Sequence, residues 1–108
     1  MKFQVKLTRN AKLEIESAYL WLKNVNPAYA DQWFRDLMGT IASLQDKPFR
    51  CAKARENDDF PEEIRQLIYG KLRNKYRIIF TIIEDMVYIL YVRHTSQSSI
   101  TFDFLDLE

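Results

Sequence analysis

Two apolar runs in the second half of the chain restrict its fold more than any other feature. Residues 78–83 and 86–92 are rich in β-branched and aromatic side chains, and only two residues, Glu84 and Asp85, separate them. Such residues favour strands, and a two-residue link is typical of a tight hairpin. The sequence therefore predicts strands at about 75–83 and 86–95, preceded by a third strand at about 64–69.

The hairpin predicts which side chains share a face of the sheet. If Ile83 pairs with Met86, the residue numbers of paired positions add up to 169, so that Lys75 pairs with His94. In that register Lys75, Arg77 and His94 lie on one face. Both faces remain largely apolar near the turn, so helices must cover one face and another segment must cover part of the other.

The first part of the chain predicts one strand and the start of two helices. Apolar and polar residues alternate from Phe3 to Leu7, which is typical of a strand with one buried face. Thr8 can cap a first helix, whose apolar residues recur at helical spacing. Asn26 and Pro27 suit the N-cap and the first position of a second helix, which makes an antiparallel helix hairpin.

The apolar pattern of the second helix predicts a broad buried face, and Pro48 is expected to end this helix. Gly39 costs this helix about 1 kcal/mol relative to alanine, so we expect another backbone to approach closely there. Residues 47–63 are polar and of mixed charge, and they predict a long loop with one irregular helical turn.

These elements predict an α+β fold in one domain, residues 1–108. The expected order is strand, helix, helix and three strands, with the helix hairpin packed on a mostly antiparallel sheet. A content of 47% hydrophobic and 29% charged residues excludes a disordered chain. No apolar run reaches the roughly 18 residues of a membrane span, and no signal peptide is recognised, so we expect a cytoplasmic protein and no membrane partner.

The scarcity of metal-binding and redox side chains excludes several classes of site. Cys51 and His94 are each the single residue of their type, so no internal disulfide and no cysteine-based zinc site can form within the chain. We expect neither a metal nor a cofactor.

The distribution of charge points to the sheet as the working surface. Residues 65–94 hold six basic and two acidic side chains, a net charge of +4, whereas the whole chain has +1. Residues 99–108 carry three acidic side chains among alternating apolar ones. Two interpretations of this tail stay open: an additional edge strand, or a cover over the cationic sheet on the surface that a partner would use.

The chain resembles the RelE/ParE superfamily of type II toxin–antitoxin toxins, in particular its ParE-like branch. The resemblance rests on the segments FQVKLTRNAKLEIE, NPAYADQWFRDLMGTIASLQDKP and KYRIIFTIIEDMVYILYVRHTSQ, and the tail beyond Ser98 falls outside it. It implies a plasmid-stabilisation toxin that a cognate antitoxin neutralises by wrapping along the helices and sheet, in a hetero-oligomer. ParE-like members act on DNA gyrase, and RelE-like members cleave messenger RNA on the ribosome.

The residues favour the ParE-like alternative. Arg77 matches by position the strand arginine that RelE-like nucleases place near the scissile phosphate, and Arg93 and His94 lie where such enzymes keep catalytic groups. The sequence after His94, however, lacks the further lysine, histidine or tyrosine of the active ribonucleases. We therefore expect a toxin that binds gyrase without chemistry of its own, with Lys75, Arg77 and Arg93 as target- or phosphate-binding residues.

Two other functions remain open. In an mRNA endonuclease Arg77 would hold the phosphate and His94 would act as acid or base. A non-toxic homologue would only bind antitoxin. A purely structural role is also open for both residues. In that case His94 makes ordinary hydrogen bonds at a strand end, and Arg77 is a solvated or ion-paired residue.

Overall fold

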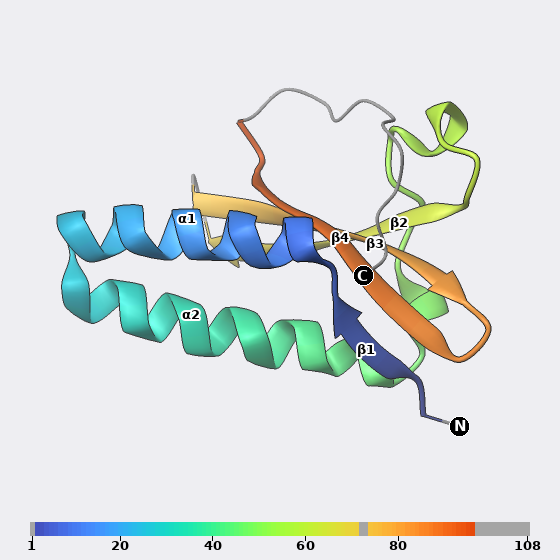
Figure 1. The fold of residues 1–108 in the computed structure, drawn as a ribbon, viewed down its shortest axis with the longest axis horizontal. Helices are drawn as coiled ribbons and strands as arrows, with labels where there is room; N and C mark the ends of the chain where they lie inside the picture. The colour runs from blue at the N-terminus through green and yellow to red at the C-terminus, as the bar shows by residue number, and fades with distance from the viewer. Residues whose placement is uncertain (1, 72–73, 97–108) are drawn as a thin grey trace.

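The computed structural model describes residues 2–71 and 74–96. Two long helices are followed by a loop with short 3-10 turns and by a hairpin-rich C-terminal half (Figure 1). The elements are β1 (Gln4–Leu7), α1 (Arg9–Val25), α2 (Pro27–Ala42), the 3-10 turns η1 (Ser43–Gln45), η2 (Pro48–Arg50) and η3 (Asn57–Asp59), β2 (Ile64–Lys71), β3 (Asn74–Ile83) and β4 (Met86–His94). The predicted order of strands and helices is confirmed, and the loop holds two 3-10 turns where one irregular turn was expected.

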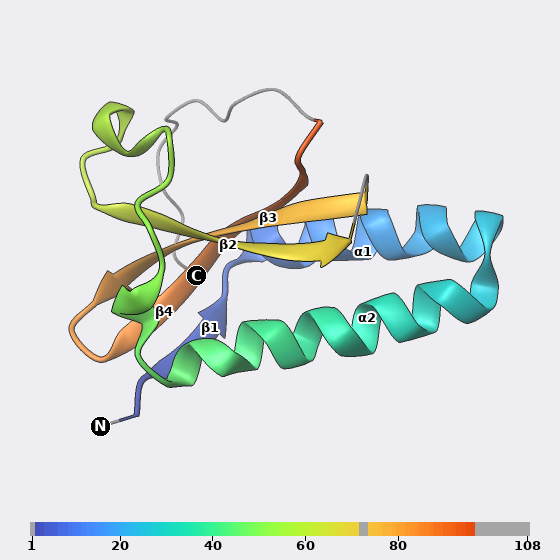
Figure 2. The same ribbon diagram turned by 180° about the vertical axis from the view of Figure 1, so that it is seen from behind.

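The four strands form a mixed sheet in the order β1-β4-β3-β2. The β4, β3 and β2 strands pair antiparallel, whereas β1 pairs parallel with β4. The helix hairpin packs on one face of this sheet, and the loop between α2 and β2 lies on the other side (Figures 1 and 2). The α+β expectation is confirmed, with the first strand placed at one sheet edge beside the last.

Both helix starts are fixed by the capping residues that the sequence predicts. The Thr8 hydroxyl accepts a hydrogen bond from the Ala11 N–H at 3.2 Å, and it donates one to the Ile89 carbonyl at 2.7 Å. The Asn26 side chain accepts from the Tyr29 N–H at 3.2 Å, with Pro27 at the first helical position. Thr8 therefore ties the start of α1 to β4 as well as capping it.

The main core lies between the helix hairpin and the sheet. Most of its buried members come from α1, α2, β3 and β4, because the apolar stripe of each helix faces the apolar side of β3 and β4. They include Ala11, Ile15, Ala30, Trp33, Leu37, Ile41, Ile78, Phe80, Val87 and Ile89.

A second, smaller core covers the opposite face of the sheet. Ala54 and Phe60 from the loop pack on Ile64, Ile79 and Leu90. The sequence predicts residues 99–108 as a candidate cover of this face. The loop between α2 and β2 covers the part of it around Ile64, Ile79 and Leu90. Residues 99–108 themselves lie outside the described part of the chain.

The register of the β3–β4 hairpin changes halfway along. Ile83 pairs with Met86 as expected, but a bulge between Ile79 and Phe80 shifts the register by one residue from there on. Beyond it Tyr76, and not Lys75, is the partner of His94. The predicted pairing of Lys75 with His94 is therefore wrong, because an extra residue in one strand reverses the faces of all that follow.

Gly39 also differs from its expected role. A Cβ atom built there would meet nothing within 4 Å. No described backbone approaches this glycine, so the close contact predicted for it is wrong. None of the described helices is long and apolar enough to span a membrane.

Candidate functional site

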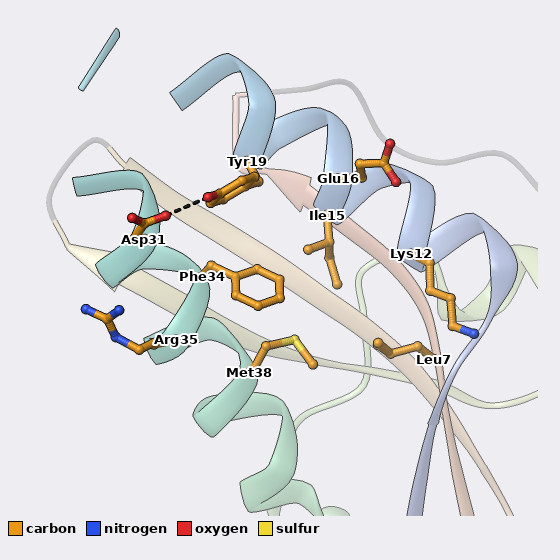
Figure 3. A pocket seen from close by; sticks show the side chains of 9 residues that line it. All are labelled: Leu7, Lys12, Ile15, Glu16, Tyr19, Asp31, Phe34, Arg35 and Met38. Atoms are coloured by element: carbon orange, nitrogen blue, oxygen red, sulfur yellow. Dashed lines mark hydrogen bonds between the residues drawn. The ribbon is translucent and has the colours of Figure 1, made fainter. Parts of the chain in front are cut away.

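A groove runs along the outer side of the helix hairpin, between α1 and α2 (Figure 3). Its volume is about 540 Å³. Four apolar side chains form most of its lining, and four charged ones stand around them: Leu7, Ile15, Phe34 and Met38, then Lys12, Glu16, Asp31 and Arg35. Phe34 is 40% exposed, which is unusual for a phenylalanine next to a core. An apolar floor with charges of both signs at the rim suits a partner segment that is itself amphipathic.

One end of the groove is held by a polar cluster that bridges the two helices. The Tyr19 hydroxyl donates to the Asp31 carboxylate at 2.5 Å, and Lys23 forms an ion pair with it at 3.3 Å. The Tyr19 hydrogen bond, followed by the Lys23 ammonium, lowers the pKa of Asp31. The Tyr19 ring also meets Phe34 edge to face, with ring centroids 5.7 Å apart. This cluster keeps the two helices in place at one end of the groove.

The other end of the groove opens on the edge of β1. A second hollow of about 350 Å³ continues from it and shares Leu7, Lys12 and Met38. The Gln4 N–H donates to the Asp85 carbonyl in the β3–β4 turn at 2.9 Å, and the Thr8 N–H donates to the Ile89 carbonyl of β4 at 3.1 Å. Because such bonds alternate along a strand, the N–H groups of Val5 and Leu7 point away from the sheet. Among the described residues no further strand pairs with this edge.

Arg77, the residue most strongly expected to act on a phosphate, lies in a buried ion pair. Its guanidinium donates to both carboxylate oxygens of Glu56, at 2.8 and 2.5 Å, and to the Gln66 side-chain oxygen at 3.1 and 2.7 Å. Arg77 is 4% exposed and Glu56 3% exposed. Four of the five guanidinium donor positions are thereby directed at protein acceptors, which leaves little capacity for a substrate phosphate.

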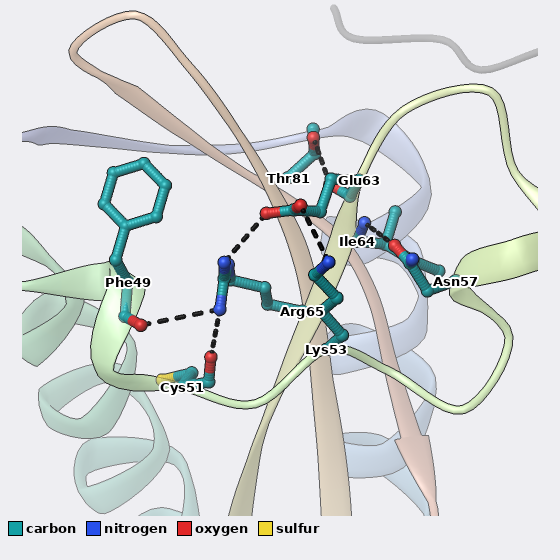
Figure 4. A network of polar contacts seen from close by, with 8 residues as sticks. All are labelled: Phe49, Cys51, Lys53, Asn57, Glu63, Ile64, Arg65 and Thr81. Carbon is teal, nitrogen blue, oxygen red and sulfur yellow. Dashed lines mark hydrogen bonds and ion pairs between the residues drawn. The ribbon is translucent and has the colours of Figure 1, made fainter.

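The loop that carries Glu56 is fastened to β2 by a second polar network (Figure 4). Arg65 donates to the Cys51 carbonyl at 2.5 Å and to the Glu63 carboxylate at 2.8 Å, and it stacks on Phe49 at 5.3 Å. Asn57 accepts from the Ile64 N–H at 2.8 Å. These contacts fix both ends of the loop, so that Glu56 is held over the sheet. Burial raises the pKa of the Cys51 thiol, which disfavours its reactive thiolate form.

The structure separates the residues that the sequence placed together. Arg77 and Arg93 are cross-strand partners and share the sheet face opposite the helices, where Lys75 also lies by alternation on β3. His94 pairs with Tyr76, and its ring stands against the Tyr76 ring with centroids 5.2 Å apart, on the helix side. The expected grouping of His94 with Lys75 and Arg77 on one face is wrong, and the bulge is the reason.

His94 takes part in local contacts at the end of β4. Its Nδ1 atom lies 2.7 Å from the Ser96 hydroxyl and 3.1 Å from the Ser96 N–H, which can donate to it. A nitrogen that accepts this N–H bond carries no proton of its own. His94 also lines a hollow between α1 and the end of the sheet, together with Trp21 and Tyr76.

Sequence reasoning missed Glu56 and Glu14. Glu56 belongs to an irregular loop, so no periodicity indicates that its side chain turns inward. Glu14 accepts from the Val92 N–H at 3.0 Å, on the part of β4 that extends past β1. Burial raises the pKa of Glu14, an effect that the Val92 hydrogen bond and Arg93 partly offset. The described residues contain no group of three or more His, Cys, Asp or Glu side chains that could hold a metal ion.

Comparison with known proteins agrees with the geometry. The family model described as ParE toxin of type II toxin-antitoxin system, parDE, matches residues 5–99. A solved chain described as the chromosomal ParDE TA system from P. aeruginosa is similar in structure, with a TM-score of 0.70 and 19% sequence identity. The match covers 86% of this chain and 96% of that one. No curated protein matches the chain significantly.

Proposed function

The chain belongs to the family of ParE toxins of type II toxin–antitoxin systems, and from this premise we propose that it inhibits DNA gyrase by protein binding and that its cognate antitoxin neutralises it. One observation carries the choice of binding over catalysis. The Arg77 guanidinium is bound on two sides by Glu56 and Gln66 and is shielded from solvent. RNA cleavage needs a cation free to meet a phosphate, together with an acid and a base beside it.

The antitoxin is proposed to occupy the groove between α1 and α2 and to continue along β1. An amphipathic helix can place its apolar side chains over Phe34 and Met38 and its charged ones against the rim. An extended segment can then pair with the outward N–H groups of Val5 and Leu7 by adding a strand to the sheet. The continuity of the two hollows supports a single partner chain that contacts both.

The gyrase contact is proposed to lie on the opposite face of the sheet. Lys75 and Arg93 offer positive charge there, and Arg77 supports the surface through its ion pair with Glu56. Positive side chains on this scale steer association with an acidic partner surface and increase its rate. If gyrase and the antitoxin bind separate faces, they do not compete for the same residues. The antitoxin then neutralises the toxin either by changing the accessibility of the gyrase-binding face or by forming a ternary complex.

A supercoiling assay tests the proposed target. Purified protein should block supercoiling by gyrase, and the double variant Lys75→Gln/Arg93→Gln should weaken the inhibition by about tenfold, as expected when two interface charges are lost. Lys47→Gln removes an exposed charge outside the proposed surface and serves as the matched control. Ribosome-dependent mRNA cleavage that disappears with Arg77→Lys, in a folded variant, would instead establish the nuclease. Absence of growth arrest on expression would identify a non-toxic homologue.

Binding of the cognate antitoxin tests the proposed groove. Phe34→Glu places a charge on the apolar floor and should weaken antitoxin binding by at least about tenfold. Trp21→Glu makes the same type of change on α1, at a side chain that is 64% exposed and lines a different hollow. Equal loss of affinity in both variants would contradict the assignment of the groove.

A further inference from the structure

One end of the sheet face opposite the helices carries an unbalanced positive charge. We call it the cationic end and define it by Lys75, Arg77 and Arg93. Arg55 of the loop lies beside it, with its Nε atom 3.5 Å from the Glu56 carboxylate. Glu56 forms ion pairs with Arg55 and Arg77, and the Glu14 carboxylate on α1 attracts Arg93 through its charge. Four cations and two carboxylates leave this group with a net charge of +2.

Within this group Arg93 has the attraction of the Glu14 charge, but no described carboxylate forms an ion pair or hydrogen bond with it. Arg77 and Arg93 stand directly opposite each other on β3 and β4, and like charges in that position repel. Glu56 and Gln66 bind Arg77 from the side of the loop and β2. The Nε atom of Arg93 is buried and finds no hydrogen-bond acceptor among the described residues. A buried guanidinium N–H without an acceptor costs free energy, so an acceptor from outside the described part of the chain would stabilise this position.

The chain itself supplies a suitable acidic segment next to this position. Residues 97–108 follow Ser96, two positions after the last residue of β4, and they include Asp103, Asp106 and Glu108 but no basic side chain. Their charge of −3 is opposite in sign to the excess of the cationic end and large enough to balance it. A fully extended chain of this length reaches roughly 40 Å, more than enough to return from Ser96 to Arg93. Residues 100–108 also lie beyond the stretch that the family model matches.

We propose that residues 97–108 bind the cationic end of the same chain, with carboxylates of Asp103, Asp106 or Glu108 accepting hydrogen bonds from Arg93 and Lys75. The segment then acts as a built-in acidic ligand. Its apolar side chains, which alternate with the acidic ones, meet the Ile68 side chain, which pairs with Arg77 from β2 and is 45% exposed. A second consequence rests on the proposed function: the segment competes with gyrase for Lys75 and Arg93.

Zero-length coupling on the full-length protein tests the intrachain contact. A carbodiimide joins a carboxylate to an amine only when the two touch, so Lys75 should form an amide with Asp103, Asp106 or Glu108 that peptide mass spectrometry detects. The amine introduced by Arg93→Lys should form a second one. Lys75→Arg keeps the charge but cannot couple, and it should abolish the first product. An equimolar mixture of isotope-labelled and unlabelled protein should give products within one chain only.

Two results would overturn the contact. Coupling of these three carboxylates to other lysines, or to none, means that the segment does not bind the cationic end. Products that join labelled to unlabelled chains mean that it binds a second copy. A further measurement is hydrogen exchange of β4 amides, which should become about two- to fivefold faster in Asp103→Asn/Asp106→Asn/Glu108→Gln, the change expected from pairs of partly exposed charges. Unchanged exchange would also count against the contact, and Asp58→Asn/Asp59→Asn is the matched control on the loop.

The supercoiling assay separates this inference from the proposed function. If both hold, the triple acid variant inhibits gyrase more strongly than the wild type. If coupling is found but neither protein affects gyrase, the intrachain contact stands and the gyrase target is wrong. If gyrase is inhibited equally by both proteins and no coupling is found, the target stands and the contact is refuted.

Discussion

Removal of the Glu56 carboxylate tests whether Arg77 is a structural residue. Glu56→Ala leaves a guanidinium that is 4% exposed with Gln66 as its remaining described side-chain partner. Breaking a buried ion pair by removing one partner costs about 3–5 kcal/mol, because the other charge stays desolvated and unpaired. A domain of this size has a free energy of unfolding of about 5–15 kcal/mol, so this single change removes a large fraction of it.

Urea unfolding followed by circular dichroism measures the effect. Asp58→Ala, an exposed acid on the same loop, should change the free energy of unfolding by less than about 0.5 kcal/mol. The double variant Glu56→Leu/Arg77→Met replaces the pair by apolar side chains and should recover most of the loss, since such exchanges are often neutral. The double-mutant cycle should therefore show strong coupling between the two positions.

The reasoning has a clear point of failure. A loss below about 1 kcal/mol for Glu56→Ala, together with additive single and double variants, would mean that solvent screens the pair and that the loop opens readily. Arg77 would then be accessible to a phosphate, and the mRNA endonuclease hypothesis would regain its main residue. Stability of the fold and choice of function thus depend on the same contact.

Four other predictions follow from local geometry. Gly39→Ala should raise the free energy of unfolding by about 1 kcal/mol, because a Cβ atom there meets nothing within 4 Å. Gly70→Ala should prevent stable folding, since φ is +111° and a Cβ atom would lie 2.1 Å from the Asn74 carbonyl oxygen, and thermal melts of both alanine variants compare the two sites. Thr8→Ala should cost about 1–2 kcal/mol in urea titrations, because the α1 cap and the bond to β4 are lost together. Burial raises the pKa of Glu14 in the folded state. Its contribution to the free energy of unfolding is therefore most favourable below the unfolded pKa and declines as the pH rises through the folded pKa. Glu14→Gln should flatten that part of the pH–stability profile.

Local signals predicted the elements of the fold because each depends on neighbouring residues. The caps at Thr8 and Asn26 and the strand hairpin at Glu84 and Asp85 use side chains or backbone within a few positions. The resemblance to the ParE-like branch was confirmed by the family match over residues 5–99. Alternation then assigned the faces of β3 correctly, since that strand keeps a regular pattern throughout.

The arrangement of the candidate site depends on features without a local signal. A bulge adds one residue at Leu90, and nothing in a run of apolar β-branched and aromatic side chains indicates where it falls. It moves His94 to the helix side and brings Arg93 opposite Arg77. The partner of Arg77 is equally hidden, because Glu56 comes from an irregular loop 21 positions earlier. The predicted roles of Lys75, Arg77 and Arg93 in target binding stay predictions.

The bulge and the buried ion pair together favour binding over catalysis for one physical reason. General acid–base catalysis of RNA cleavage needs a proton-transfer group and a phosphate-binding cation within a few ångströms of one substrate. Here the imidazole of His94 and the guanidinium of Arg77 belong to opposite faces of one sheet, so a single phosphate cannot contact both without rearrangement of β4. Moving Leu90 out of the bulge would return His94 to the face of Arg77, but Glu56 would still hold the guanidinium. Deletion of Leu90 closes the bulge but leaves His94 opposite Tyr76, so this deletion combined with Glu56→Gln should give no ribosome-dependent cleavage, and cleavage in the wild-type protein would contradict this separation.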